Sequence, residues 1–347
     1  MKRHLLFLAA LLIVNLAAYA QKKFSVYAVG FYNQENLFDT CHDEGKKDYE
    51  YLPNKGWNGM KYTNKLRNMS KALADMGTDV LPNVGCAFIG LSEVENHKVL
   101  DALVDQAPLK ERNMKYVHIE GPDRRGIDCA LLYNPSLFSV KNVKLLPYVQ
   151  ELAKDSAFFT RGFLTVRGEM AGDDVAVIVC HWPSRFSGPF YRESAARQVK
   201  VIKDSLLNVN QEMKIFVMGD MNDDPVNKSM HVYLQAKPEI SQVGAGDMYN
   251  PWYNVLAKEG KGTLFYSGNW NLFDQIVITP NLLNKDAKKK DYSSLKYWKS
   301  HIFRRDYLIQ QEGQYKGAPL RTTAGGRWLN GYSDHLPVVM YLVKEKK

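Results

Sequence analysis

The chain has 347 residues, of which 45% are hydrophobic, 12% aromatic and 24% charged. This is ordinary globular composition, so it excludes the collagen-like, coiled-coil and intrinsically disordered classes. The 46 Lys and Arg residues exceed the 37 Asp and Glu residues and give a formal net charge of +9, which suits an anionic partner such as nucleic acid, phosphorylated lipid or an acidic glycan.

The beginning of the chain has the pattern of a secretory signal peptide. Lys2 and Arg3 precede the apolar residues 5–14, and Ala18-Tyr19-Ala20 supplies the small residues that a signal peptidase requires. The apolar run is shorter than the ~20 residues of a membrane-spanning helix. We therefore expect cleavage before Gln21 and export, to the periplasm or out of the cell, of a protein without a stable membrane anchor.

Strand-like and helix-like segments are mixed along the rest of the chain. Apolar residues at spacings of three and four predict helices over Tyr62–Met76, ahead of Gly77, and over Glu193–Leu207. Short, mostly continuous apolar runs are typical of strands in a sheet covered on both faces. In chain order, the predicted strands are Phe24–Tyr32, Cys86–Leu91, Ile127–Tyr133, Val175–Cys180, Lys214–Met218, Phe273–Ile278 and Leu336–Val343.

No Pro-, Gly- or Ser-rich linker and no internal repeat interrupts this pattern. We therefore predict that residues 1–20 are the signal peptide and that residues 21–347 form one α/β domain, which we expect to be monomeric. The segment Lys285–Lys299 combines three consecutive lysines with aromatic residues, and we interpret it as a solvated surface loop.

Polar side chains follow most of the predicted strands or lie within them. Each one alone is a common turn residue, but together they are expected to converge at one edge of a sheet, where α/β enzymes place their sites. In chain order they are Asn33, Glu35, Asn36, Glu93, Glu95, Asn96, His181, Asp220, Asn222, Asp274, Asp334 and His335.

The residue types in this set indicate hydrolysis of a phosphate ester. Asn33, Glu35, Glu93 and Asp334 offer oxygen ligands, which suit Mg²⁺, with Mn²⁺ and Ca²⁺ as alternatives. Two histidines beside such a metal can transfer protons on both sides of an in-line displacement. The sequence contains no Gly-x-Ser-x-Gly nucleophile motif and no Walker or Rossmann glycine pattern.

These residues stand in motifs that resemble the endonuclease/exonuclease/phosphatase superfamily, which includes deoxyribonuclease I, AP endonucleases, neutral sphingomyelinases and inositol polyphosphate 5-phosphatases. The resemblance covers about residues 24–344, and the motifs occur in the order of the family. They are Phe31-Tyr32-Asn33-Gln34-Glu35-Asn36-Leu37-Phe38-Asp39, Gly90-Leu91-Ser92-Glu93-Val94-Glu95-Asn96, Arg125-Gly126-Ile127-Asp128, His181-Trp182-Pro183-Ser184-Arg185, Gly219-Asp220-Met221-Asn222-Asp223-Asp224-Pro225, Phe273-Asp274-Gln275-Ile276 and Ser333-Asp334-His335-Leu336-Pro337-Val338.

The resemblance implies a four-layer α/β sandwich, in which two packed mixed β-sheets are flanked by helices and a metal-dependent site lies at the sheet edges. It also implies a set of metal ligands. Glu93 resembles the principal ligand of the family and is assisted by Asn33 and Glu35, while Asp334 resembles a further ligand or a bridge to it.

The catalytic residues are implied in the same way. Asp220 and Asn222 resemble the pair that positions the attacking water and holds the scissile phosphate. His335 resembles the catalytic histidine, and Asp274 the carboxylate that fixes its tautomer. His181 stands where deoxyribonuclease I and the sphingomyelinases have histidine and AP endonucleases have tyrosine, which makes an AP endonuclease a poorer match.

Four further residues match the family less closely. Glu120 is expected to orient the second histidine. Arg125 and Asp128 are expected either to contact substrate or to form a structural pair, and Arg185 is expected near the substrate phosphate.

Together these features favour an exported metal-dependent phosphodiesterase, and within that class a nuclease that hydrolyses DNA or RNA. A phosphoesterase acting on sphingomyelin, inositol phosphates or nucleotides would use the same site, and its basic residues would contact a head group instead. A non-catalytic binding module is the third reading, but it has no need of paired histidines beside a metal site.

Overall fold

The computed structural model describes residues 23–151, 158–286 and 288–346. The predicted signal peptide, residues 1–20, lies outside the described residues. Within the described part of the chain, no helix is both long enough and apolar enough to cross a lipid bilayer.

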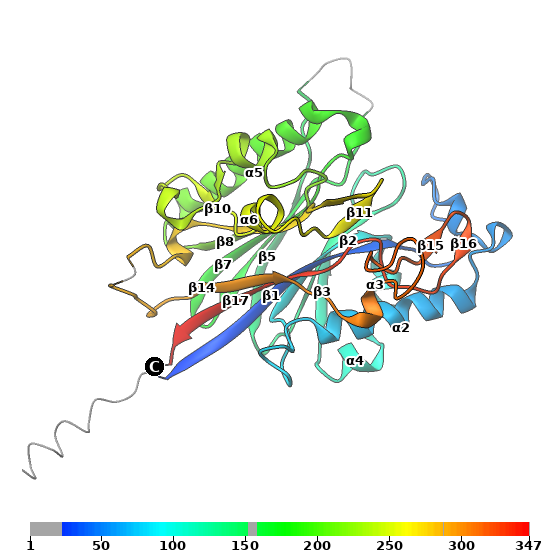
Figure 1. Ribbon diagram of the computed structural model, residues 1–347, viewed down its shortest axis with the longest axis horizontal. Helices are drawn as coiled ribbons and strands as arrows, with labels where there is room; N and C mark the ends of the chain where they lie inside the picture. The colour runs from blue at the N-terminus through cyan, green and yellow to red at the C-terminus, as the bar shows by residue number, and fades with distance from the viewer. Residues whose placement is uncertain (1–22, 152–157, 287, 347) are drawn as a thin grey trace, which may run out of the picture.

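Two large β-sheets pack face to face and carry helices on their outer sides (Figure 1). The six-stranded sheet has the order β14 (Lys296–Ile302), β17 (Val338–Glu345), β1 (Phe24–Leu37), β2 (Phe88–Val94), β4 (Asp128–Tyr133) and β3 (Lys115–His118). The seven-stranded sheet has the order β5 (Phe138–Leu146), β6 (Phe163–Met170), β7 (Asp173–His181), β8 (Lys214–Asp220), β13 (Asp274–Ile278), β10 (Met248–Tyr249) and β9 (Ala236–Lys237). Two small hairpins pair β11 (Leu264–Tyr266) with β12 (Asn269–Asn271) and β15 (Thr323–Ala324) with β16 (Arg327–Trp328).

Three apolar clusters hold these layers together. Between the sheets, Phe31 and Phe88 of the first sheet pack with Val177 and Met218 of the second. On the outer side of the first sheet lie α2 (Gly59–Asp75), α3 (His97–Val104) and α4 (Ala107–Lys110), and on the outer side of the second lies α5 (Pro189–Val209). A short helix, α6 (Tyr253–Ala257), precedes the β11–β12 hairpin. The predicted four-layer α/β sandwich is therefore confirmed.

The helices begin where the local sequence favours it. The side chain of Asn58 accepts a hydrogen bond from the backbone N–H of Lys61 and caps α2, and Asn96 accepts from two backbone N–H groups and caps α3. Gly77, with a φ of +82°, follows α2 in the left-handed conformation that ends helices. Pro189 occupies the first turn of α5.

Several strands run beyond the apolar segments that predict them. β1 continues to Leu37, β2 to Val94, β7 to His181 and β8 to Asp220. Their polar ends are buried and still pair with neighbouring strands, so hydrogen bonding rather than apolar character decides where these strands stop. Four functional side chains consequently stand at sheet ends, those of Glu93, His181, Asp220 and Asp274, whereas Asn222, Asp334 and His335 lie on the connecting segments beside them.

The prediction of a surface loop over Lys285–Lys299 is wrong at its C-terminal end. Lys296–Ile302 forms β14, which pairs antiparallel with β17 at the edge of the first sheet. An edge strand with one solvated face carries polar side chains, so continuous apolar character does not reveal it.

Close packing of β7 against β8 leaves no room for a side chain at Gly219. A Cβ atom there would collide with the backbone carbonyl oxygen of Cys180. We therefore expect Gly219→Ala to lower the free energy of unfolding by about 1–3 kcal/mol, measured from urea denaturation midpoints. Gly59→Ala, at an open position at the start of α2, is the matched control and should cost nothing. Equal midpoints for both variants would contradict this account.

Candidate active site

Strand pairing brings three reactive side chains side by side on the second sheet. In the parallel pair β7–β8, His181 is the partner of Asp220, and in the antiparallel pair β8–β13, Asp274 is the partner of Asp220. All three side chains are at most 5% exposed. The register of three neighbouring strands therefore fixes the buried carboxylate of Asp220 between the imidazole of His181 and the carboxylate of Asp274.

The first sheet contributes Glu93 and the amide that joins it to the second sheet. The side-chain nitrogen of Asn33 donates to Glu93 Oε1 at 3.3 Å and to Asp220 Oδ2 at 3.0 Å. The side-chain oxygen of Asn33 accepts from the backbone N–H of Glu35 at 2.8 Å, which fixes the orientation of the amide. In this arrangement Asn33 bridges two carboxylates and directs a donor, not an oxygen, at them.

The backbone around these residues is strained. Glu35, Asn36, Glu93 and Asn222 have φ between 46° and 60°, the left-handed region that non-glycine residues seldom adopt. Each such residue costs about 1–3 kcal/mol, and such strain concentrates at functional sites. The pairing of β1 with β2 also shifts register after Asn33, so the regular pairing of the two strands is interrupted where they reach the site.

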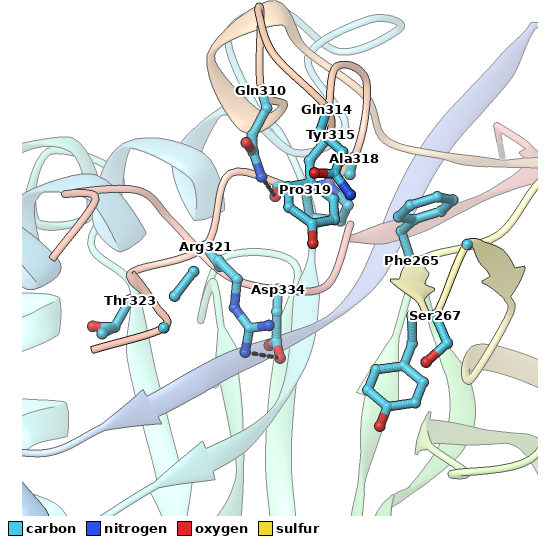
Figure 2. A pocket seen from close by; sticks show the side chains of 14 residues that line it. Phe265, Ser267, Gln310, Gln314, Tyr315, Ala318, Pro319, Arg321, Thr323 and Asp334 are labelled. Atoms are coloured by element: carbon cyan, nitrogen blue, oxygen red, sulfur yellow. Dashed lines mark hydrogen bonds and ion pairs between the residues drawn. The ribbon is translucent and has the colours of Figure 1, made fainter. Parts of the chain in front are cut away.

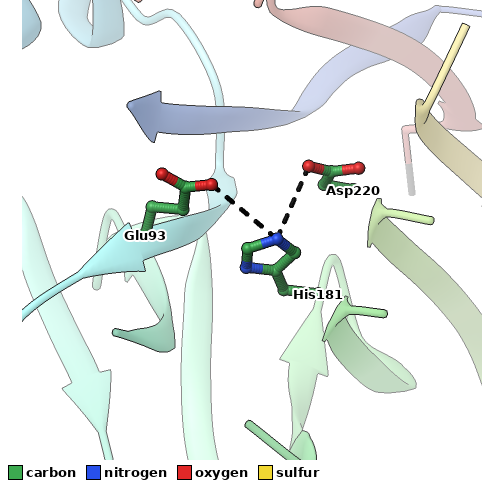
Figure 3. Close-up of side chains that lie close together, drawn as sticks. All are labelled: Glu93, His181 and Asp220. Atoms are coloured by element: carbon green, nitrogen blue, oxygen red, sulfur yellow. Dashed lines mark ion pairs between the residues drawn. The ribbon is translucent and has the colours of Figure 1, made fainter. Parts of the chain in front are cut away.

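Glu93, His181 and Asp220 form a cluster that fits a divalent metal ion (Figure 3). His181 Nε2 lies 3.8 Å from Glu93 Oε1 and 3.6 Å from Asp220 Oδ2, and the three ligand atoms lie within 4.8 Å of one another. Among the described residues, no Lys or Arg pairs with either carboxylate within 4 Å. Burial, together with the neighbouring Asp274 and Glu93, raises the pKa of Asp220 to about 7 despite the opposing effect of His335. A bound cation would relieve this concentration of negative charge.

His335 reaches the cluster from the segment that precedes β17. Its Nδ1 lies 2.7 Å from Asp274 Oδ2, and its Nε2 faces Asp220 Oδ2 at 3.8 Å. Burial alone would lower the pKa of His335, but the carboxylates of Asp274 and Asp220 outweigh it and raise this pKa well above the ordinary value. By contrast, burial and the charges of Arg161 and Arg125 lower the pKa of His181 well below the ordinary value. In the metal-free protein these opposite shifts favour a charged imidazole at His335 and a neutral one at His181.

Two of the predicted metal ligands are bound to an arginine that the sequence did not single out. Arg321 Nε lies 3.1 Å from Glu35 Oε1, and its Nη2 lies 3.0 Å from Asp334 Oδ2. The backbone N–H of Thr322 donates to Glu35 Oε2 at 2.6 Å. Arg321 occupies one oxygen of each carboxylate, so it neutralises part of the charge that Glu35 and Asp334 would offer a metal ion. No pattern in the sequence distinguishes this arginine.

A buried lysine supports the same loop from below. Lys65 of α2 is 2% exposed, and its ammonium group donates to Thr322 Oγ1 at 2.6 Å and to the carbonyl oxygen of Tyr332 at 2.5 Å. Burial lowers the pKa of Lys65 to about 8, and burial together with Asp334 raises that of Glu35 to about 7. Helix α2 therefore anchors the chain around Arg321.

Two of the less specific predicted residues lie away from the chemistry. The carboxylate of Glu120 is 61% exposed and pairs with Lys46 at 3.3 Å, whereas His181 Nδ1 has no hydrogen-bond partner among the described residues. No contact therefore supports Glu120 as the group that orients His181. Asp128 is buried against His118 Nε2 at 3.1 Å and the backbone N–H of Gly121 at 2.9 Å, which is a structural environment.

The remaining predicted residues surround a cavity of about 260 Å³ above the cluster. Arg125 lines it and donates to Asn36 Oδ1, and Asn222 lines it and donates to the carbonyl oxygen of Trp182 at 2.9 Å. Arg185 lies beside the cavity, where it pairs with Asp224 at 2.8 Å and stacks over the ring of Phe273. Its charge is therefore already neutralised.

Arg161 is a second residue that the sequence analysis missed. It lines the cavity, pairs with Asp123 at 3.0 Å and donates to the carbonyl oxygen of Trp182 at 3.0 Å. Because it lies just before β6, a strand that the apolar runs did not reveal, no motif placed it near the site.

The carboxylate of Asp274 accounts for much of the basicity of His335. In the metal-free protein, Asp274→Asn should lower the pKa of the His335 imidazole, measured by NMR titration of the ring signals. The raised pKa also means that protonated His335 stabilises the fold at acidic pH and that this stability is lost as pH rises through the folded-state pKa. The His181 signals are the internal control. An unchanged His335 titration would show that Asp274 does not govern this imidazole.

Several solved structures share this fold at low sequence identity. An endonuclease/exonuclease/phosphatase family protein from Bacteroides thetaiotaomicron is 14% identical, with a TM-score of 0.55 over 94% of this chain and 97% of that one. The mannosyl-6-phosphatase of the same organism is also 14% identical, with a TM-score of 0.55 over 91% and 99%. D. rerio TDP2 complexed with a single-strand DNA product is 12% identical, with a TM-score of 0.53 over 92% and 99%. At these identities the similarity shows the fold alone.

No curated protein matches this chain. A family model does, and it covers residues 28–344, which include both sheets and every residue of the site. The chain therefore belongs to the Endonuclease/Exonuclease/phosphatase family, whose members are metal-dependent phosphoester hydrolases.

Proposed function

We propose that this hydrolase cleaves phosphodiester bonds in single-stranded nucleic acid and that it does so outside the cytoplasm. One observation carries the choice of substrate: exposed aromatic side chains flank the phosphate site, and Arg124 and Arg125 add positive charge beside one of them. Proteins that bind single strands combine such stacking surfaces with positive charge along the backbone.

On one side of the cavity, Phe159 is 51% exposed, and the guanidinium of Arg124 lies 5.4 Å from the centre of its ring. Arg125 follows on the same side. On the other side, beyond Leu264, the ring of Tyr266 is 68% exposed. A strand lying through the cavity would place a phosphate at the carboxylate–imidazole cluster and a base near each aromatic ring. TDP2 in complex with a DNA product offers a precedent on this fold.

A second candidate is a phosphate ester of a small sugar or nucleotide. The cavity over the cluster holds only about 260 Å³, and an adjoining groove of about 680 Å³ is closed enough to hold one small molecule. The mannosyl-6-phosphatase neighbour shows that the fold supports such a reaction.

The carboxylates of Glu93 and Asp220 are the residues best placed to hold the metal ion. Their hard oxygen donors favour Mg²⁺, with Mn²⁺ or Ca²⁺ as alternatives. When bound, the ion neutralises the charge that develops on the phosphate in the transition state. Asn33, Glu35 and Asp334 stay predicted ligands.

The chain's own residues supply the proton transfers. Neutral His181 can accept a proton from the attacking water at Nε2, and charged His335, held at Nδ1 by Asp274, can donate one from Nε2 to the leaving oxygen. The carboxylate of Asp220 lies within 4 Å of Nε2 of both imidazoles and can stabilise positive charge on either of them. These assignments are part of the proposal.

Removal of any of these side chains should stop catalysis with the fold intact. We expect His335→Ala, His181→Ala, Glu93→Ala and Asp220→Ala each to lower the rate on single-stranded DNA or RNA with Mg²⁺ by at least ~10²-fold. His301→Ala is the matched control, because this histidine lies on β14 and pairs with Asp79. Wild-type turnover in the Glu93 and His335 variants would refute the assignment of the site.

The leaving group separates the roles of the two histidines. With bis-p-nitrophenyl phosphate the departing p-nitrophenolate needs little protonation, so His335→Ala should lose less activity on this ester than on DNA. His181→Ala should lose the same factor on both substrates, because the attacking water is unchanged. If His181→Ala instead lost less activity on this ester than on DNA, and His335→Ala lost the same factor on both, His181 would be the proton donor and His335 the proton acceptor.

Export can be tested on the protein itself. Expression of the full chain in a Gram-negative bacterium should yield a periplasmic or secreted protein whose N-terminal sequence begins at Gln21. Ala20→Arg, which removes the small residue at the cleavage point, should block processing. A full-length N-terminus on the cytoplasmic protein would contradict the proposal.

A further inference from the structure

A second cavity opens beside the catalytic one. It has a volume of about 680 Å³ and lies between the tip of the β11–β12 hairpin and the segment from Gln310 to Gly325 (Figure 2). This volume lies within the range of sites that enclose small molecules.

Backbone pairing places the two cavities next to each other. Leu264 and His335 are partners in an isolated antiparallel bridge, and both line the catalytic cavity. Their chain neighbours, Phe265 and Asp334, line the second one. Asp334 Oδ1 lies 3.9 Å from His335 Nε2, so the lining of this groove begins within 4 Å of the catalytic imidazole.

The hairpin presents its aromatic side chain rigidly. Ser267 and Gly268 have φ of 48° and 81°, so the two strands are joined by a two-residue turn with two left-handed residues, which matches the twist of a tight hairpin. Phe265 and Trp270 pair across the strands with their ring centres 5.2 Å apart. The backbone at Tyr266, next to the turn, is therefore fixed, and its side chain is 68% exposed beside the groove.

The opposite wall is polar, and its charged side chains are Arg321 and Asp334. It carries Tyr315, which is 52% exposed, and the side-chain amides of Gln310 and Gln314. Arg321 pairs with Asp334 at 3.0 Å (Figure 2) and with Glu35 at 3.1 Å, so two carboxylates share its charge. Exposed ring faces and neutral hydrogen-bonding groups suit a flat, uncharged ring with polar edges, and among the described lining residues no unpaired cation would attract a second phosphate.

We propose that this groove binds the nucleoside attached to the scissile phosphate, with its base stacked on Tyr266 or Tyr315. The inference rests on the proposed nuclease function and deepens it. It states that the enzyme recognises the nucleoside next to the scissile phosphate and not the neighbouring phosphates of the nucleic-acid backbone. A sugar ring in the same groove is the competing occupant.

Three chromogenic phosphodiesters with the same leaving group test this assignment. They are methyl p-nitrophenyl phosphate, thymidine 5′-(p-nitrophenyl phosphate) and thymidine 3′-(p-nitrophenyl phosphate). Tyr266→Ala and Tyr315→Ala should lower kcat/KM on at least one thymidine ester by about 10-fold, the scale of one lost base–aromatic stacking contact. The same loss should be absent on methyl p-nitrophenyl phosphate, because its methyl group offers no ring to stack in the groove.

Two controls separate stacking from damage to the fold. Tyr266→Phe retains the ring and should keep wild-type values on every ester, and Trp298→Ala removes a half-exposed aromatic ring from β14, outside both cavities. Equal losses on all three esters, or no loss on either thymidine ester in both groove variants, would overturn the assignment.

The wild-type enzyme distinguishes this inference from the function on which it rests. If it hydrolyses bis-p-nitrophenyl phosphate and DNA but the groove variants match it on the thymidine esters, the nuclease function stands and the nucleoside groove is refuted. If it hydrolyses only sugar phosphates and the groove variants lose that activity, both the nuclease function and the nucleoside occupant are refuted, and the groove binds the sugar.

Discussion

The meeting of two carboxylates from different sheets is the constraint on which the rest of the site depends. Glu93 ends a strand of one sheet and Asp220 a strand of the other, and the amide of Asn33 holds both. Among the described residues, no Lys or Arg lies within 4 Å of either carboxylate. This concentration of negative charge, together with Asp274, raises the pKa of His335, and it makes the cluster suitable for a metal ion.

Such a site is stable only because the surrounding structure compensates for its cost. Like charges are buried together, and four residues adopt left-handed backbone. The apolar layer between the sheets and the helices outside them hold the strand ends in place. At the rim, Arg321 joins Glu35 to Asp334, and Lys65 ties the same loop to α2. The apolar packing beneath the site and the ion pairs at its rim therefore offset the unfavourable free energy of the strained backbone and the buried like charges.

Reaction and specificity reside in different parts of the molecule. The groups that carry the chemistry stand on the ends of β2, β7, β8 and β13, where the sheet register fixes their spacing. The groove that we assign to the nucleoside is built from a hairpin tip and a long loop, which can vary without disturbing the sheets. Arg321 lines the groove and pairs with Glu35 and Asp334, two of the predicted metal ligands, so it connects the groove to the catalytic site.

The sequence by itself determined the class of fold, the family and the identity of the residues that meet at the site, because apolar strand segments followed by polar motifs are local features of the chain. It did not determine how far the strands extend, that Lys296–Ile302 pairs at a sheet edge, or that Arg321 and Arg161 join the site. It assigned Glu120 to His181, whereas the structure pairs Glu120 with Lys46. The division into a signal peptide and one domain stays a prediction. These points depend on the tertiary structure because hydrogen-bond partners, buried charge and ion pairs are set by residues far apart in the chain, and no local pattern records which of them will come together.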